Sequence, residues 1–257
     1  MPRPLAMRRP CPAPMVDSGM TTSAAPVALI TGASQGIGRA ICFALGRAGW
    51  RVGLCARSAA PLAALEAELR AEGIAAAAAA GDVGVEADVS RVVAAVETAL
   101  GPIDTLVNNA GILIGKRIEE LTVAEWDGTM ATNLRSLFLT TRAVLPGMRA
   151  RGQGDIINIA SLAGRNPLIG GTAYAASKHA VLGFSKSLML ETRKDGIRVI
   201  AVCPGSVDTR MLGEHSLGGT APDRRLQPED VADTVLQALR LPRRAMVSEL
   251  DIRPANP

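Results

Sequence analysis

Short aliphatic segments alternate with longer segments of helical periodicity along most of this chain, and no other feature restricts its fold as strongly. Residues 27–31 read VALIT, residues 51–56 read RVGLCA and residues 155–161 read DIINIAS. Each segment has the length and apolar character of a buried strand, and each precedes a turn or loop and then apolar residues at helical spacing. Such alternation predicts parallel strands connected by helices that cross over the sheet.

The expected fold is therefore α/β, a single-domain, Rossmann-like doubly wound parallel sheet with helices on both faces. The expected strands are residues 27–31, 51–56, 75–83, 104–111, 155–161, 197–205 and 245–253. The expected helices are residues 36–49, 60–73, 86–101, 122–151, 172–194 and 228–241, and residues 204–227 form an irregular segment. Residues 1–25, which are rich in proline, are expected to be a disordered tail, and residues 26–257 the folded domain.

The third strand is assigned against the local preference of its residues. Residues 75–80 are all alanine, and alanine favours a helix. The alternation of the whole chain nevertheless requires a strand here. We expect tertiary packing to override the propensity of the alanines.

Composition and charge argue against several classes of protein. The formal charge is +4, but half of it comes from Arg3, Arg8 and Arg9, set against Asp17, and basic runs interleaved with aromatic residues are missing. We therefore expect no nucleic-acid partner. No apolar run is long enough to span a membrane. The four cysteines are far apart and the two histidines lack clustered partners, which predicts free thiols in a cytoplasmic protein and no metal site.

Glycines follow the first predicted strand in the segment TGASQGIG, residues 31–38, where they stand at positions 32, 36 and 38. Ligands of a parallel sheet sit at the carboxyl ends of its strands. Glycines there permit a tight turn and the close approach of a diphosphate, and the following helix offers unpaired N–H groups. The segment therefore predicts a dinucleotide site, although a glycine turn without a ligand would have the same sequence.

The end of the second predicted strand indicates which dinucleotide binds. An acidic residue there accepts the ribose 2′-hydroxyl of NAD, whereas an arginine accommodates the 2′-phosphate of NADP. The chain has Ala56 at this place and Arg57 directly after it. We therefore expect NADP, with NAD as the alternative.

The chain contains one tyrosine, Tyr174, which stands four residues before Lys178 in a predicted helix. Residues four apart share a helix face, so the phenol and the ammonium group point into the same space. A neighbouring cation favours the phenolate and lowers the pKa of the phenol, which suits it to proton transfer. On this pair alone, a packed tyrosine and a solvated lysine would be the simpler interpretation.

Six separated motifs occur in an order that is similar to that of one known family. They are the glycines at 32, 36 and 38, NNAG at 108–111, Asn133, Ser161, Tyr174 with Lys178, and the Pro-Gly pair at 204–205. From Val27 to Thr209 the chain thereby resembles the short-chain dehydrogenase/reductase family, including its 3-oxoacyl-acyl carrier protein reductases. The resemblance implies a nicotinamide-dependent oxidoreductase of alcohols and ketones, with residues 26–257 as its catalytic domain.

The resemblance also implies a role for each residue of the site. Tyr174 is the general acid in ketone reduction, and Ser161 hydrogen-bonds the substrate carbonyl. Lys178 binds the nicotinamide ribose and lowers the pKa of Tyr174, while Asn133 holds a water in the proton relay. The expected cofactor contacts are Thr31, Gly32, Ser34, Gln35, Gly36, Ile37, Gly38, Arg57, Asp82, Val83, Asn109, Ala110, Gly111, Tyr174, Lys178, Pro204, Gly205, Val207 and Thr209.

The substrate is predicted only as a class. Residues 112–118, 162–170 and 206–226 should line the pocket, made apolar by Leu162, Leu168, Ile169, Met211 and Leu212. We expect a general NADPH-dependent carbonyl reductase acting on a small-molecule ketone or alcohol. A 3-oxoacyl-acyl carrier protein reductase is a near equal, for which Arg149 and Arg151 at the pocket rim could bind the acidic carrier while Asp195 argues against it.

Two further expectations concern regulation and assembly. A non-catalytic regulator that senses NADP is a third hypothesis, disfavoured by the complete set of catalytic residues. The family suggests a homotetramer or homodimer, although the C-terminal sequence SELDIRPANP departs from the usual ending of family members.

Overall fold

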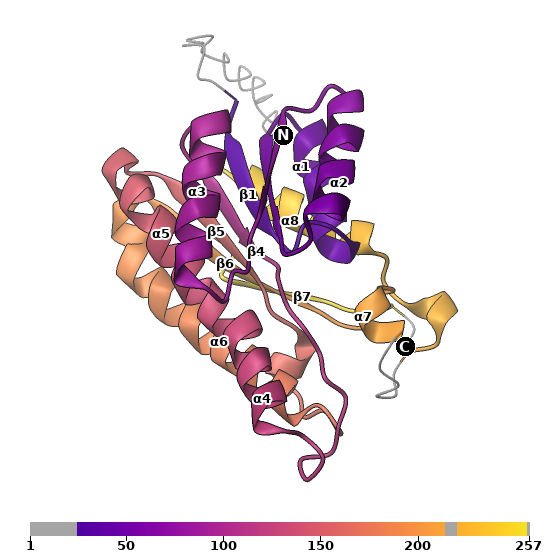
Figure 1. Ribbon diagram of the computed structural model, residues 1–257. Helices are drawn as coiled ribbons and strands as arrows, with labels where there is room; N and C mark the ends of the chain where they lie inside the picture. Colours follow the sequence, from indigo (N-terminus) through magenta and orange to yellow (C-terminus); the bar gives the residue numbers. More distant parts are fainter. Residues whose placement is uncertain (1–24, 214–219, 256–257) are drawn as a thin grey trace, which may run out of the picture.

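A computed structural model describes residues 25–213 and 220–255, so the predicted tail lies, apart from Ala25, outside the described residues. Within the described residues, seven strands form one sheet in the order β3-β2-β1-β4-β5-β6-β7, and every neighbouring pair is parallel (Figure 1). The strands are β1 (Val27–Thr31), β2 (Arg51–Ala56), β3 (Ala76–Ala80), β4 (Thr105–Asn108), β5 (Gly154–Ile159), β6 (Ile197–Pro204) and β7 (Glu249–Ile252). The predicted doubly wound parallel sheet is confirmed.

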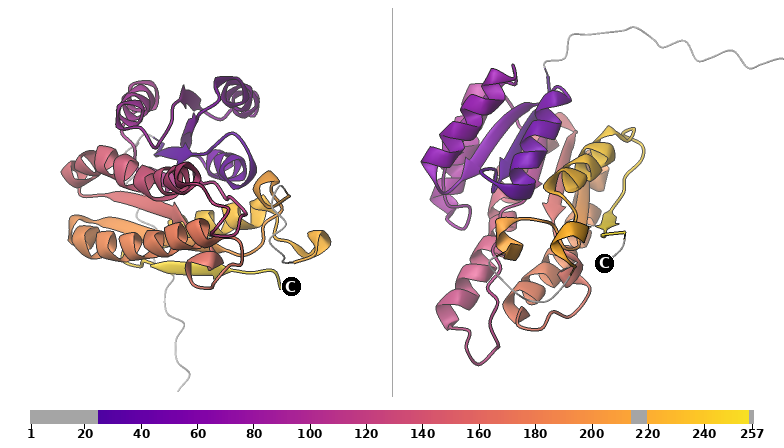
Figure 2. Two further views of the ribbon diagram at one scale, coloured as in Figure 1. Left: turned by 60° about the horizontal axis from the view of Figure 1, so that its bottom comes forward. Right: turned by 90° about the vertical axis from the view of Figure 1, so that its right-hand side faces the viewer.

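Helices flank the sheet on both faces (Figure 2). They are α1 (Gly36–Arg47), α2 (Ala59–Ala71), α3 (Glu86–Leu100), α4 (Val123–Met130), α5 (Ser136–Arg151), α6 (Thr172–Thr192), α7 (Arg210–Gly213) and α8 (Pro228–Arg240). One buried cluster joins α1, α2 and α8 to the sheet, and a second joins α3, α5 and α6 to its other face. Within the described part of the chain, no helix is both long and apolar enough to cross a membrane.

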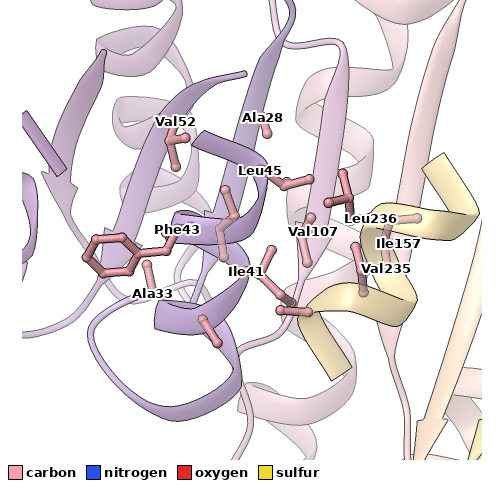
Figure 3. Close-up of a cluster of buried hydrophobic side chains, with 14 of the residues drawn as sticks. Ala28, Ala33, Ile41, Phe43, Leu45, Val52, Val107, Ile157, Val235 and Leu236 are labelled. Atoms are coloured by element: carbon pink, nitrogen blue, oxygen red, sulfur yellow. The ribbon is translucent and has the colours of Figure 1, made fainter. Parts of the chain in front are cut away.

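The core is built from aliphatic side chains. Figure 3 shows part of the first cluster, in which Ile41 and Leu45 of α1 and Val235 of α8 lie over the sheet. These three side chains have no exposed surface. Since aromatic residues make up 2% of the chain, close packing of branched aliphatic residues supplies most of the hydrophobic stabilisation.

The alanine-rich segment forms a strand, as predicted, and this strand, β3, lies at one edge of the sheet. It pairs with β2 from Val52↔Ala76 to Ala56↔Ala80, so the ladder satisfies its backbone groups. Ala76 and Ala79 are buried, and α2 and α3 both pack against the strand. Pairing and burial therefore decide the conformation here, and they override the helical propensity of alanine.

The helix predicted over residues 122–151 is interrupted once. Thr122 and Glu125 form a capping box that starts α4. Ala131–Arg135 then adopt π-helical geometry, and α5 continues to Arg151. A π-helical turn inserts an extra residue into a helix and is frequent at functional sites. Asn133, a predicted site residue, lies in this turn.

The last strand brings the chain back to the carboxyl ends of the sheet. β7 pairs in parallel with β6, with Pro204 opposite Ile252, and the amide of Gly205 donates to Ile252 O at 2.8 Å. The residues directly after β7 therefore lie next to the residues directly after β6. The segment predicted to be irregular contains the short helix α7 and a 3-10 turn at Pro222–Arg224.

A buried ionic cluster ties the segment after α8 to the amino ends of β5 and β6. The Asp155 carboxylate accepts a 2.6 Å hydrogen bond from Arg198 Nε and a 2.8 Å hydrogen bond from Arg243 Nη1. Asp155 is 9% exposed and Arg198 5% exposed. Arg198 also donates to the carbonyl groups of Leu239 and Leu241. Each charge is thus paired and hydrogen-bonded, as a buried charge requires.

Candidate active site

A cleft of about 730 Å³ opens at the carboxyl ends of the strands. Its walls come from the segments that follow β1, β2, β3, β4, β5, β6 and β7. Every predicted catalytic or cofactor residue lines this cleft except Thr31, Gly38 and Asn133. The structure therefore brings together residues that are separated by more than a hundred positions in the sequence.

The glycine turn after β1 leaves room that a side chain would fill. Gly32 and Gly36 have φ angles of +63° and +52°, which favour glycine. A Cβ atom on Gly32 would lie 2.9 Å from Ala110 Cα, and one on Gly38 would lie 2.2 Å from Gly32 O. The turn thus passes close to the end of β4 and leads into α1, whose first residues, Gly36 and Ile37, line the cleft. This cradle fits the diphosphate of a dinucleotide.

Thr31 lies behind the cleft and joins β1 to the end of β4. Its Oγ1 accepts hydrogen bonds from the amides of Asn109 (3.0 Å) and Ala110 (3.1 Å). In return, Asn109 Nδ2 donates to Thr31 O at 3.0 Å and to Gly32 O at 3.1 Å. Thr31 therefore binds the glycine turn to the NNAG segment, and it does not line the cleft, in which a direct contact with the cofactor is expected for it.

Arg57 and Asp82 mark the end of the cleft that suits adenosine. Arg57 directly follows β2, is exposed and lines the cleft beside Ser58 and Pro61. The Asp82 side chain accepts a 2.8 Å hydrogen bond from the Gly84 amide, which fixes its orientation. Asp82 is the one acidic residue among the described residues that line the cleft. Because no carboxylate follows β2 there, the site favours a ribose that carries a 2′-phosphate.

Ser161, Tyr174 and Lys178 share one wall of the cleft. The Ser161 hydroxyl is hydrogen-bonded to the Tyr174 hydroxyl, and Ser161 Oγ accepts a 3.1 Å hydrogen bond from the Ala163 amide. Lys178 Nζ lies 5.7 Å from the centroid of the Tyr174 ring and donates to Ile159 O at 2.8 Å. The α6 spacing therefore places the phenol and the ammonium group together, as the sequence predicts.

The pKa of Tyr174 departs from expectation. Burial raises the pKa of the phenol above its usual value, and the hydrogen bond with Ser161 lowers it by a smaller amount. Burial also lowers the pKa of Lys178 to about 8. The net shift of the Tyr174 pKa is therefore upward and not downward as expected, because desolvation penalises the phenolate more strongly than the hydrogen bond with Ser161 stabilises it.

Asn133 acts through neighbours that the sequence did not single out. Its Oδ1 accepts from the Ile112 amide at 2.8 Å, and its Nδ2 donates to Ile112 O at 2.9 Å and to Ser177 Oγ at 3.0 Å. Ser177 Oγ in turn donates to Tyr174 O at 2.7 Å. The π-helical turn thus directs the Asn133 side chain to the Ile112 backbone and to the Ser177 hydroxyl of α6, behind the cleft wall.

The substrate end of the cleft is largely apolar. Ile112, Leu113, Leu162, Pro167, Leu168, Met211 and Leu212 line it. Ile169 is 88% exposed and does not line the cleft, so its predicted place is wrong. Arg253 and Pro254 line the cleft without having been predicted. Only the parallel pairing of β7 brings them there, and no motif in the sequence encodes that pairing.

Arg149 and Arg151 lie away from the cleft. Arg149 Nε pairs with Asp195 Oδ2 at 2.8 Å, and Arg151 Nη2 donates to Ile103 O at 2.6 Å. Ile103 precedes β4, so both arginines lie toward the amino ends of the strands, opposite the chemistry. Their expected place at the pocket rim is therefore wrong for a single chain, because α5 runs antiparallel to the strands.

The fold and the cleft together define a dinucleotide-binding oxidoreductase of the α/β class. The model of the family described as "short chain dehydrogenase" matches residues 26–218. The chain belongs to this family, whose members are nicotinamide-dependent oxidoreductases.

Similar proteins include reductases of ketoacyl groups. A Streptomyces coelicolor protein provisionally named a ketoacyl reductase is 44% identical over 194 residues, which cover 75% of this chain and 74% of the relative. A structure of an actinorhodin polyketide ketoreductase variant with NADPH has a TM-score of 0.85 at 37% identity, and covers 91% of this chain and 98% of its own. The structure of a 3-ketoacyl-ACP reductase from Sinorhizobium meliloti has a TM-score of 0.82 at 34% identity. The match covers 89% of this chain and 98% of the reductase.

Proposed function

We propose that this protein reduces a ketone to a secondary alcohol with NADPH, and that Tyr174 donates the proton to the carbonyl oxygen. The observation that carries this proposal is the shared cleft wall on which Ser161, hydrogen-bonded to Tyr174, stands beside Lys178. The glycine cradle lies in the same cleft. The family and the NADPH and NADP complexes of similar structures support the choice of cofactor.

Each residue contributes a separate step. NADPH, when bound, supplies a hydride to the carbonyl carbon. Ser161 donates a hydrogen bond to the carbonyl oxygen and so places it beside the Tyr174 hydroxyl. Tyr174 transfers its proton to that oxygen, which balances the hydride and yields the alcohol. Lys178, whose Nζ lies 5.7 Å from the ring centroid, stabilises the phenolate that is left. Asn133 holds the backbone of α6 through Ser177.

The second candidate is reduction of a 3-oxoacyl thioester. The ketoacyl reductases among the similar proteins favour it, and the apolar substrate end of the cleft suits an acyl chain. The pairing of Arg149 with Asp195 weighs against carrier binding at that surface of a single chain. A general carbonyl reductase and a 3-oxoacyl reductase therefore share one site and one reaction, and they differ in substrate.

The distinguishing experiment follows NADPH oxidation by the purified protein. An acetoacetyl thioester is compared with simple ketones and diketones of similar size. We expect turnover of at least one class, and the ratio of the kcat/KM values assigns the substrate. An absence of NADPH oxidation with every carbonyl compound, in a protein that binds NADPH, would contradict the proposed reaction.

We expect Arg57→Gln to raise the Kd for NADPH about ten- to a hundredfold, the effect of one charge-assisted hydrogen bond to a phosphate. NADH lacks the 2′-phosphate, so its Kd should change little. Fluorescence titration of both dinucleotides measures the two effects. Arg117→Gln removes the same charge from a side chain that is 76% exposed and outside the cleft, and it should leave both affinities unchanged. Equal losses for NADPH and NADH in the Arg57 variant would exclude the phosphate contact.

We also propose a homodimer or homotetramer in a cytoplasmic compartment. The family supports the assembly, and Phe138 on α5 is 49% exposed, as a residue of a subunit interface can be in one isolated chain. Cys42, Cys55 and Cys203 are free and buried, which is compatible with a reducing compartment. Light scattering measures the molecular mass, and a monomer at micromolar concentration would exclude the assembly.

A further inference from the structure

Arg253 is a cation at the substrate end of the cleft that the reaction proposed above does not use. It follows β7 directly and lines the cleft together with Pro254. A Cβ atom on Gly205 would lie 3.1 Å from Pro254 Cδ and 3.3 Å from Leu162 Cδ1. The chain after β7 therefore packs beside Leu162, the neighbour of the catalytic serine.

Strand register gives the distance between Arg253 and the reacting centre. Ile159 pairs with Val202 across β5 and β6, and Pro204 pairs with Ile252 across β6 and β7. The register therefore places three residues side by side across the sheet: Ser161, Pro204 and Ile252. Ser161 and Ile252 are separated by two strand spacings. Two spacings correspond to about 10 Å between backbones. A substrate carbonyl at Ser161 and a group held by Arg253 would thus be several bonds apart.

The position of Arg253 is held by an ionic clamp. Asp251 Oδ1 pairs with Arg165 Nε at 3.0 Å, and Asp251 Oδ2 pairs with Arg253 Nη2 at 3.1 Å. Arg165 also pairs with Glu249, which fixes the loop after β5 to β7. In the described structure, the bond to Asp251 is the one hydrogen bond of the Arg253 side chain. A guanidinium group carries five N–H donors, so further donors can face the cleft.

The charges around Arg253 favour an anion. Among the described residues that line the cleft, the one carboxylate, Asp82, belongs to the adenosine end. Leu162 and Pro254, which both lie close to Gly205, make the adjoining wall of the cleft apolar. An incoming carboxylate would meet the Arg253 guanidinium, and Asp251, its hydrogen-bonded acid among the described residues, does not line the cleft.

We propose that Arg253 selects ketones that carry an anionic group several bonds from the carbonyl. The anion is a carboxylate of the substrate itself, which a guanidinium group recognises by charge-assisted hydrogen bonds. This inference rests on the proposed ketone reduction for its substrate. Binding of an anion by Arg253 can be measured without turnover, so it can be tested separately from the proposed reaction.

The test compares Arg253→Gln with the parent protein on matched pairs of ligands. One series contains methyl ketones of graded length that end in a carboxylate, each paired with its neutral methyl ester. A second pair consists of the phosphorylated and unphosphorylated pantetheine thioesters of one acyl group. Calorimetry of the corresponding hydroxy acids and hydroxy esters, with NADP⁺ present, measures binding without a reaction.

For the parent protein, we expect the anionic member of one pair to have a KM about tenfold below that of its neutral partner, as one charge-assisted hydrogen bond provides. Arg253→Gln should abolish that preference, while kcat and the KM of the neutral compound stay unchanged. Added salt should weaken the preference because Arg253 is exposed. An effect confined to the phosphate pair would overturn the assignment of the ligand to a carboxylate several bonds from the carbonyl.

Arg244→Gln is the matched control. It removes the same charge from an exposed arginine that does not line the cleft, so the preference for anions should persist. Equal binding of anionic and neutral ligands by the parent protein would overturn the proposal, and so would an equal loss of both in Arg253→Gln. A protein that oxidises no NADPH but binds the hydroxy acids through Arg253 would overturn the proposed reaction alone.

Discussion

Replacing Tyr174 with phenylalanine is expected to lower kcat for ketone reduction by about a hundred- to ten-thousandfold, the usual contribution of one general acid. The phenyl ring keeps the packing of the side chain and loses only the proton that the carbonyl oxygen receives. The hydrogen bond to Ser161 is lost with it. Stopped-flow measurement of NADPH oxidation under single-turnover conditions reports the chemical step directly, and fluorescence titration reports NADPH affinity, which should stay unchanged.

The matched control is Ser187→Ala, which removes a hydroxyl from the same helix α6 at a position outside the cleft. Its turnover should equal that of the parent protein. A Tyr174→Phe protein with undiminished turnover would exclude Tyr174 as proton donor. A parent protein that binds NADPH without turnover, and a Tyr174→Phe variant that binds it equally well, would support the hypothesis of a non-catalytic NADP-sensing regulator.

Replacing Asp155 with asparagine is expected to lower the free energy of unfolding by about 3–5 kcal/mol, the cost of removing one partner of a buried ion pair. The asparagine keeps the shape of the side chain, but it leaves the buried Arg198 guanidinium without its counter-charge. Arg243 loses the same carboxylate. Urea denaturation, monitored by circular dichroism, measures this loss of stability as a lower urea concentration at the midpoint of unfolding.

Asp195→Asn provides the comparison for this stability effect. Asp195 also pairs with an arginine, Arg149, but the two side chains are 36% and 47% exposed. Exposed pairs contribute about 0–1 kcal/mol, so this variant should unfold near the parent midpoint. Similar losses in the two variants would mean that burial does not set the strength of the Asp155 cluster. Turnover per folded molecule should be normal in both, since neither residue lines the cleft.

The sheet and most of the cleft could be predicted from the sequence because strand ends carry local signals. Parallel strands end at one edge, so the glycine turn, the NNAG segment and Ser161 had to converge once the alternation was recognised. Even the alanine strand β3 followed from the alternation. These predictions depend on the order of strands and helices along the chain. They do not depend on which elements lie side by side in space.

The remaining features depend on which elements lie side by side. Arg253 reaches the cleft because β7 pairs with β6, and Arg149 misses it because α5 ends at the opposite edge of the sheet. The π-helical turn at Asn133 leaves no trace in the spacing of apolar residues. The direction of the Tyr174 pKa depends on burial, which a four-residue spacing does not report.

The two walls of the cleft tolerate very different amounts of sequence change. On the cofactor side, one added methyl group at Gly38 would stand 2.2 Å from Gly32 O, and one at Gly32 would stand 2.9 Å from Ala110 Cα. The substrate side is built from segments 162–170, 210–212 and 253–254, which lie outside the strands. Combinatorial libraries for new ketone selectivity therefore belong in these three segments, where a lineage or an experimenter can vary the substrate while the dinucleotide stays the same.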